Sequence, residues 1–475
     1  MRTAARHVSP YSGSWYPGDT EELRTLVERV FSGSEHRTGR WSAPRAAAFV
    51  VPHAGLVYSG TVAGAAWRQV RALEPERIIL LGFTHRGAVR GAWIPEIEGI
   101  ETPLGDVEVD TLCAEALVET GAFGWLDERQ VCDHSVEIQL PLLQTAAPNA
   151  RIVPVYVNQL PAVARLAAAR ALASLAGPGT VLVASSDFTH YGRSFSFQPF
   201  PVDESTPSLL RELDDSVIEA AATLDPGEFL RVLGETGATV CGSGPISLLL
   251  ETLRFISEQE EIFQETLDYQ TSGEITGDFR QSVSYAALGY FPYRALELAP
   301  DDAQALIESA RRTLTHFVAT GRREPLAPER SSAALERHAA AFVTLHSEGE
   351  LRGCIGRGTS TEPLDRLVPR LALSAALDDP RFPPLRPGDA EPTVEISVLS
   401  PLKRLCSLER FRVNEHGALL EAGPDRGLLL PQVAQERNWT AAQFLEALVR
   451  KAGAPRNVYS DPSTRVHVFR AQVIR

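Results

Sequence analysis

The chain has 475 residues, of which 44% are apolar and 22% charged, so it can build a sizeable core, is not disordered throughout, and is long enough for two or three domains. No apolar run reaches the length of about 18 residues that crosses a bilayer, and the N-terminus lacks the apolar stretch of a secretory signal. We therefore expect a cytoplasmic protein with no membrane partner. Five scattered cysteines form no CxxC pair, so we expect no disulfide framework. The net charge of −14 is concentrated in residues 1–295, which hold 22 basic and 37 acidic residues, whereas residues 296–475 hold 24 and 23. This distribution argues against nucleic-acid binding.

The first 295 residues alternate short apolar runs with helical periods. Each apolar run has about the length of a buried strand, and the residues between the runs show the three- and four-residue spacing of an amphipathic helix. This alternation indicates a layered α/β fold around a mostly parallel sheet. The predicted strands are 46–51, 77–81, 152–157 and 181–184, and the predicted helices are 23–31, 112–118 and 163–175.

A domain boundary is expected near residue 295, which makes 1–295 the first domain. The apolar run 282–291 predicts a buried strand, a proline and an acidic stretch follow it, and helical spacing begins at Asp302. The later signals mix strands, helices and short hairpin turns, which predicts a smaller α+β domain over 296–475. Its predicted strands are 341–345, 393–399 and 465–469, and its predicted helices are 363–377 and 440–451.

Three histidines of the first domain stand just past predicted buried strands. His53 and His85 each follow a strand directly, and His190 comes a few residues after another strand, beside Asp187. In open α/β sheets, ligands bind outside the carboxyl ends of the strands. A single histidine in such a place is more often structural, but three of them predict one cleft, in which Asp187 can orient His190 for acid–base chemistry.

Cys241 is the cysteine best placed for chemistry. It lies in a glycine-rich turn before a strong helix pattern, where Ser243 suits the N-cap and Pro245 an early helical position. A thiol beside a helix N-terminus is favoured as thiolate. The alternative is a buried, inert cysteine, which is what we expect of Cys113 and Cys132.

His134 lies at the start of a predicted helix that runs to Leu143. Ser135 is placed to cap this helix, and Glu137 lies in its first turn. A structural role for His134 and a catalytic role at the rim of the site both remain open.

At this point the residues resemble a known family. Six short motifs occur in the order of those of the Memo family, and together they span nearly all of residues 1–295. Six ordered motifs rarely coincide by chance, so the resemblance is specific. The motifs begin at Gly13 (GSWY), Pro52 (PHAG), Gly82 (GFTH), Asp133 (DHSVE), Ser185 (SSDFTH) and Thr239 (TVCG).

The Memo resemblance implies a fold similar to the class III extradiol dioxygenases, which use non-haem iron. It also implies a metal centre with His53, His85 and Cys241 as ligands, and with Asp187 and His190 beside the metal as acid–base groups. Imidazole and thiolate donors suit Fe(II), which we expect first, and also Cu or Zn. The thiolate departs from the two-histidine, one-carboxylate set of non-haem oxygenases. In an alternative arrangement, His190 is a ligand and Cys241 is a free redox thiol.

The C-terminal domain resembles the AMMECR-type family. The resemblance rests on 351–356 (LRGCIG), 378–385 (DDPRFPPL) and 430–434 (LPQVA), and it covers most of 300–475. Memo-type and AMMECR-type proteins are components B and A of the AmmeMemoRadiSam system. The chain is therefore similar to a fusion of the two, and a radical-SAM protein is the implied partner.

The glycine-rich motif of the second domain has two interpretations. Arg352, Cys354 and Arg381 could line a pocket for an anionic ligand. Alternatively, the glycines of 351–356 serve a tight turn or close strand packing, and Cys354 is simply small and buried.

Three functions are compatible with these residues. The first is a metal-dependent oxidoreductase of dioxygenase-like type, acting on an unknown small molecule or peptide. The second is a non-catalytic module that binds a peptide or a modified substrate for a radical-SAM partner. The third is a hydrolase whose metal activates water.

Overall fold

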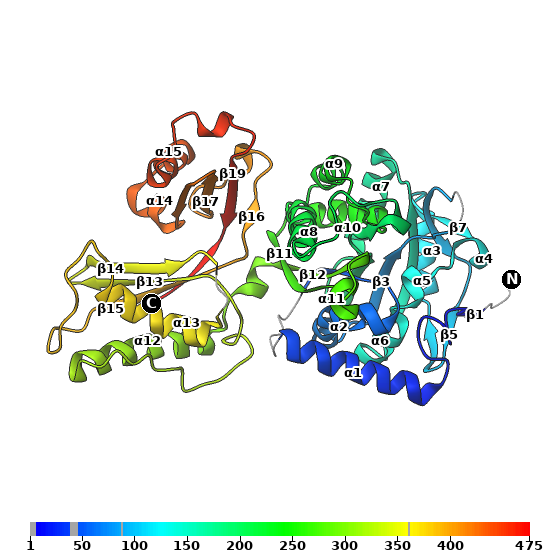
Figure 1. Ribbon diagram of the computed structural model, residues 1–475, viewed down its shortest axis with the longest axis horizontal. Helices are drawn as coiled ribbons and strands as arrows, with labels where there is room; N and C mark the ends of the chain where they lie inside the picture. The colour runs from blue at the N-terminus through cyan, green and yellow to red at the C-terminus, as the bar shows by residue number, and fades with distance from the viewer. Residues whose placement is uncertain (1–5, 39–45, 87–88, 360–361) are drawn as a thin grey trace. The chain divides into compact units, whose positions relative to one another are not determined.

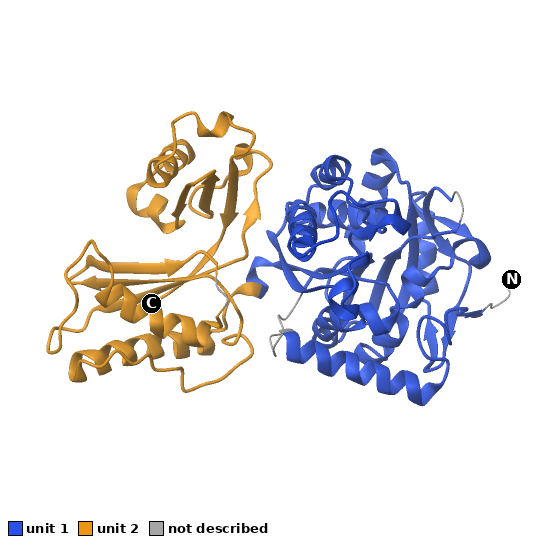
Figure 2. Cartoon of the chain, in the orientation of Figure 1, with its two compact units in different colours: residues 1–39, 43–295 blue, residues 40–42, 296–475 orange. Residues whose placement is uncertain are grey.

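A computed structural model of the chain describes residues 6–38, 46–86, 89–359 and 362–475 (Figure 1). The chain divides into two compact units between Ala295 and Leu296 (Figure 2). Each unit has its own hydrophobic core, so we propose that each folds by itself, with its own cooperative unfolding transition when expressed separately. Within the described ranges, no helix combines the length and the apolar character that a membrane span requires.

The first unit is built on a nine-stranded sheet, and its α/β class is the one expected. Four central strands run parallel, and antiparallel strands flank them on both sides, so the sheet is less uniformly parallel than the sequence suggests. The central strands, in spatial order, are β2 (Ala48–Val51), β9 (Thr180–Ser185), β3 (Arg77–Gly82) and β8 (Arg151–Asn158). On one side β12 (Gln281–Pro292) pairs with β2, and β10 (His190–Gly192) and β11 (Ile262–Thr271) pair with β12. On the other side β4 (Gly91–Pro95) pairs with β8, and β7 (Gly124–Leu126) pairs with β4.

The direction of β12 has a local cause. Only the short helix α11 (Ser272–Thr276) and a turn join β11 to β12, and a connection this short suits antiparallel neighbours, whereas parallel neighbours need a crossover. The apolar run 282–291 indicates a buried strand but carries no information on its direction.

Helices cover both faces of this sheet. In Figure 1, α1 (Thr20–Thr38), α2 (Leu56–Leu73) and α6 (Leu140–Ala146) lie on one side of it, and α7 (Ala162–Leu175) and α10 (Ser243–Ile256) on the other. Ile79 and Leu81 of β3 share a core with the helices of the second group. The unit is completed by α3 (Thr111–Glu119), α4 (Glu128–Val131), α5 (His134–Glu137), α8 (Thr206–Ala222), α9 (Pro226–Thr236) and a small sheet of β1 (Arg6–Val8), β5 (Gly99–Thr102) and β6 (Gly105–Glu108).

Over its described residues, the second unit contains two four-stranded antiparallel sheets and four α-helices, which is the α+β architecture expected. Its first hairpin turns at Glu348 and Gly349, both with positive φ, as hairpin turns of two residues require. The first sheet consists of β13 (Ala341–Ser347), β14 (Glu350–Arg357), β15 (Thr393–Leu399) and β20 (Ala471–Ile474), with α12 (Pro300–Thr320) and α13 (Leu364–Leu377) packed on it. The second consists of β16 (Lys403–Arg404), β17 (Gly417–Ala422), β18 (Asp425–Leu429) and β19 (Arg465–Phe469), together with α14 (Gln432–Arg437) and α15 (Ala441–Ala452).

Gly242, the residue before α10, has no room for a side chain. A Cβ there would lie 2.5 Å from the Cβ of Ser186 and 2.6 Å from the carbonyl oxygen of Ser185. We expect Gly242→Ala to destabilise the protein by about 1–3 kcal/mol, the usual cost of overpacking. Gly234→Ala is the matched control, because its Cβ meets nothing within 4 Å and alanine favours a helix by about 1 kcal/mol. Urea unfolding midpoints measure both, and equal midpoints for the two variants would contradict the argument.

Candidate metal centre

His53 is the buried centre of the candidate site. It follows β2, only 2% of its surface is exposed, and its Nε2 lies 3.1 Å from Sγ of Cys241. Its Nδ1 lies 3.2 Å from Oγ of Ser185, and its backbone N–H donates to Asp187 Oδ1 at 2.7 Å. Burial, reinforced by the imidazole of His85, lowers the pKa of His53 to about 3. The ring is therefore neutral at physiological pH, the state in which imidazole binds a metal.

Cys241 faces His53 as a thiol, not as the thiolate predicted from the sequence. Burial and the Asp187 carboxylate raise the pKa of Cys241, and this desolvation outweighs the nearby helix dipole. Ser243 is also the first residue of α10 and not its N-cap, which is Gly242 and has no side-chain bond. The backbone N–H of Asp187 donates to Sγ at 3.2 Å. A bound cation is the charge that would convert this half-buried thiol to thiolate.

His85 follows β3, and Asp133 holds it from two directions. The His85 Nδ1 lies 2.8 Å from Asp133 Oδ1, and the His85 backbone N–H donates to Oδ2 at 3.0 Å. Burial opposes the ionisation of Asp133, but the hydrogen bond from His85 and the nearby imidazoles lower its pKa to about 2. With Nδ1 engaged by a carboxylate, Nε2 of His85 is left as the ligand atom.

His134 lies flat between two rings. It stacks on Trp15 at 4.0 Å and on His85 at 4.2 Å between ring centroids. Burial lowers the pKa of His134 to about 3, although Asp133 opposes the shift. The stack places His134 beside the candidate ligands, so it does more than begin a helix.

The local structure around His134 corrects two expectations. The N-cap is the Asp133 side chain, which accepts from the backbone N–H of Ser135, so Ser135 is not the cap. The helix ends at Glu137, and α6 begins separately at Leu140 instead of continuing the same helix to Leu143.

Asp187 lies beside Cys241, and both Asp187 and His190 are held by backbone groups. Asp187 is buried and accepts from the N–H of Ala54 as well as that of His53, and burial raises its pKa. The Nδ1 of His190 lies 3.0 Å from the carbonyl oxygen of Phe188 and 3.1 Å from that of Thr239. Carbonyl oxygens only accept hydrogen bonds, so Nδ1 of His190 carries a proton and donates to them. Backbone carbonyls, and not Asp187, orient Nδ1.

Five of the six predicted site residues, all but His190, form two overlapping groups around His53. The ligand atoms of His53, His85 and His134 lie within 4.8 Å of one another, and so do those of His53, Asp187 and Cys241. His85 and Cys241 both adjoin His53 but belong to different groups. His190 lies close enough to influence the charge of both His53 and Asp187.

Three supporting residues carry no role in the sequence argument. Asp133 and Ser185 hold the outer nitrogens of His85 and His53, and Trp15 supports His134. Each belongs to one of the quoted motifs, which was the available signal. Their partners lie at least 48 residues away, so the contacts themselves could not be read from the chain.

The donors of this site fit a transition metal. Metal-binding histidines usually donate their other ring N–H to a carboxylate, hydroxyl or carbonyl, which fixes the ring and its tautomer. His85 and His53 both show this arrangement, on Asp133 and Ser185. Two imidazoles and one cysteine sulfur are borderline-to-soft donors, which favour Fe, Cu or Zn over Mg or Ca.

In the second unit, the motif residues hold one another in place. Arg381 donates to both carboxylate oxygens of Asp379, at 2.9 and 2.7 Å, and Asp379 accepts from the backbone N–H of Cys354 at 2.8 Å. Arg381 also donates to the carbonyl oxygen of Cys354. The hydrogen bond from Arg381 lowers the pKa of Asp379. The charge of Arg381 is thus balanced inside the motif, which weakens the interpretation as an anion pocket.

The glycines of the same motif are explained by close packing. A Cβ on Gly353 would lie 2.1 Å from the carbonyl oxygen of Ala375 in α13, and one on Gly356 would lie 2.1 Å from the ring of Phe342. These contacts support the second interpretation of the motif, in which the glycines allow β14 to pack closely.

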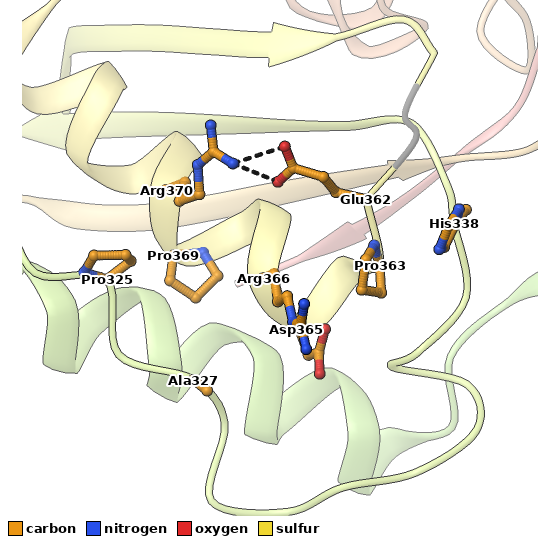
Figure 3. A pocket seen from close by; sticks show the side chains of 9 residues that line it. All are labelled: Pro325, Ala327, His338, Glu362, Pro363, Asp365, Arg366, Pro369 and Arg370. Atoms are coloured by element: carbon orange, nitrogen blue, oxygen red, sulfur yellow. Dashed lines mark hydrogen bonds and ion pairs between the residues drawn. The ribbon is translucent and has the colours of Figure 1, made fainter. Parts of the chain in front are cut away.

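A separate cavity of about 540 Å³ lies beside the first turns of α13 (Figure 3). None of Arg352, Cys354 and Arg381 lines it. Within it, Arg370 donates to both carboxylate oxygens of Glu362 at 2.7 Å, so an anionic ligand would first have to displace Glu362.

Comparisons with known proteins identify both parts of the chain. The family model described as Memo-like protein matches residues 6–289, and the one described as AMMECR1 matches residues 307–474. The chain is 33% identical to a memo-1 homolog of Caenorhabditis elegans, over 58% of this chain and 80% of that protein. It is 32% identical to a MEMO1 family protein of Methanothermobacter thermautotrophicus, over 58% and 97%. An uncharacterized protein of Pyrococcus horikoshii, solved by crystallography, is 33% identical over 37% of this chain and 92% of that chain, with a TM-score of 0.35.

Asp133 is expected to set the affinity of the site for a metal without being a ligand. Asp133→Asn removes the charge that fixes His85, and the loss of such a support usually costs about 10–100-fold in metal affinity. Competition with a chelating dye measures the change. Asp127→Asn is the control, because Asp127 also caps a short helix, α4, but contacts none of the candidate ligands among the described residues. An unchanged affinity in Asp133→Asn would show that His85 is not a ligand.

Proposed function

Because the chain belongs to the Memo family, with an AMMECR1 domain after its Memo domain, we propose that it is a non-haem metal-dependent oxidoreductase of dioxygenase-like type. The proposed ligands are His53, His85 and Cys241, and the proposed metal is Fe(II), with Cu or Zn as alternatives. One observation carries the proposal. The Nε2 of His53 and the Sγ of Cys241 face each other at 3.1 Å, while Ser185 engages the other nitrogen of the ring.

The donor set decides which chemistry is proposed. Two imidazoles and a thiolate leave coordination positions for a substrate or dioxygen, and Fe(II) bound there would supply one-electron redox chemistry. The neutral His53 can bind a metal directly at neutral pH, whereas the Cys241 thiol has to release its proton when the metal binds, since ligand groups bind in their unprotonated form.

The residues beside the ligands have separate proposed roles. His190, whose Nδ1 is held by two carbonyl oxygens, is the proposed group for proton transfer to or from a bound substrate through its other ring nitrogen, Nε2. Asp187 positions the ligands, because its N–H contacts Sγ and its carboxylate holds the turn that carries His53. His134 and Trp15 form a stacked wall beside His85. We propose a small molecule or a peptide as substrate, and a radical-SAM protein as the partner that supplies or consumes it.

A metal-dependent hydrolase is the second candidate, and the three-histidine group favours it. His53, His85 and His134 bring three imidazoles within 4.8 Å, and three histidines with one open position are a catalytic zinc set that activates water. The two candidates differ in which residue completes the site, Cys241 or His134.

The ligand assignment is tested by metal content. We expect His53→Ala, His85→Ala and Cys241→Ser each to reduce the metal that remains on protein purified without chelator, because each removes one of three donors. Cys113→Ser is the control, since Cys113 lies in α3 and belongs to none of the candidate groups among the described residues. Elemental analysis by mass spectrometry gives the stoichiometry.

The same measurement separates the candidates. Full occupancy in Cys241→Ser, combined with loss of zinc in His134→Ala, would replace the oxidoreductase with the hydrolase. Metal-free protein of native stability would instead favour a non-catalytic, substrate-binding module.

Asp187 and His190 are expected to affect turnover more than metal binding. Asp187→Asn and His190→Gln should keep the metal, with affinity reduced by no more than the about 10–100-fold of a supporting residue, and should lose metal-dependent oxygen consumption. Metal titration and an oxygen electrode give the two readouts. If His190→Gln loses far more affinity than Cys241→Ser, then His190 is the ligand and Cys241 a redox thiol.

A further inference from the structure

A second group of donor side chains lies apart from the metal centre. His7 of β1, Cys132 at the end of α4 and Glu137 of α5 bring one nitrogen, one sulfur and one carboxylate oxygen within 4.8 Å of one another. None of the three belongs to the groups around His53. The sequence argument treats Cys132 as an inert buried cysteine and gives His7 no role, so this cluster is a finding of the structure alone.

Glu137 shows that the cluster is incomplete as it stands. Its side chain has no exposed surface, and its Oε1 lies 3.0 Å from Nε2 of His7. Its other oxygen, Oε2, is buried and has no hydrogen-bond partner. A buried carboxyl oxygen without a hydrogen-bond partner is costly, and a cation held between the three side chains would satisfy it.

Cys132 supplies a sulfur donor, which makes the group selective for a transition metal. It is 3% exposed, and burial raises its pKa well above the usual value, so its sulfur becomes a thiolate only with a cation beside it. Glu128 and Asp133 add negative charge around the cluster, and Arg86 adds a single opposing charge. The net field therefore favours a divalent cation.

The distances are compatible with zinc. In a tetrahedral zinc site, metal–ligand distances of about 2.0–2.3 Å place the ligand atoms about 3.3–3.8 Å apart. The His7–Glu137 pair is already at 3.0 Å, and every other pair in the group is within 4.8 Å. Small side-chain rotations would bring the three ligand atoms to these separations.

We propose that His7, Cys132 and Glu137 bind a second divalent transition-metal ion, zinc by the nature of the donors, in a structural site. The ion fastens the N-terminal strand β1 to the segment that contains α4 and α5. That segment also carries Asp133, which fixes His85. The second ion thus stiffens the support of the first metal centre without taking part in its chemistry.

Cobalt(II) tests the site directly, because a bound thiolate gives Co(II) an intense near-ultraviolet charge-transfer band. The background is the full-length His53→Ala/Cys241→Ser variant, in which the first site has lost a histidine and its only thiol. We expect one equivalent of Co(II) to bind with this band, zinc to displace it, and Cys132→Ser added to this background to abolish it. Cys113→Ser and Cys354→Ser are the matched controls and should keep the band.

Two results would overturn the proposal. One is the absence of the band in the background variant, and the other is its survival after Cys132→Ser. If Cys132→Ser does not fold, as judged by circular dichroism, then His7→Gln decides. His7 is partly exposed, so this variant should fold, and it should lower zinc affinity by at least tenfold. An unchanged affinity in His7→Gln would exclude the site equally.

Discussion

The parallel pairing of β2, β9 and β3 is the constraint on which the metal centre depends. In this register Val51, the last residue of β2, lies beside Ser185, the last residue of β9, and β3 runs alongside. The loops after the three strands therefore leave the sheet at one edge, and His53, Asp187 and His85 start from neighbouring points. A hydrogen bond from the backbone N–H of His53 to the Asp187 carboxylate joins two of these loops. Without that register, the donors would not share a site.

A buried polar network gives His53 its orientation. The side-chain amide of Gln139 donates to the carbonyl oxygen of Pro52 at 2.8 Å and to Oγ of Ser185 at 3.1 Å, and Trp67 donates to its oxygen at 2.9 Å. Both polar atoms of the Gln139 side chain therefore have hydrogen-bond partners, which offsets the cost of burying them. Ser185, fixed in this way, holds Nδ1 of His53. Gln139, the residue before α6, therefore fixes the orientation of the His53 ring through Ser185.

The segment from Cys132 to Glu137 serves two clusters at once. Asp133 orients His85 in the first, and Cys132 and Glu137 supply donors to the second. Cys132 and Asp133 have extended backbone between α4 and α5, and the Asp133 side chain caps α5. The second unit follows another principle, since its glycine-rich motif is explained by close packing of β14 against α13.

The sequence by itself determined where the four central strands of the first sheet lie, that both units are mixed α and β, and that His53, His85 and His190 follow strand ends. Apolar periodicity and strand boundaries are local properties of the chain. The direction of β12, the neutral state of Cys241 and the two groups around His53 were decided by the tertiary structure. Desolvation depends on what covers a side chain, and hydrogen bonds such as that between His7 and Glu137 join residues 130 positions apart. No local pattern records such contacts, so only the folded chain shows that Glu137 is buried with one oxygen unsatisfied.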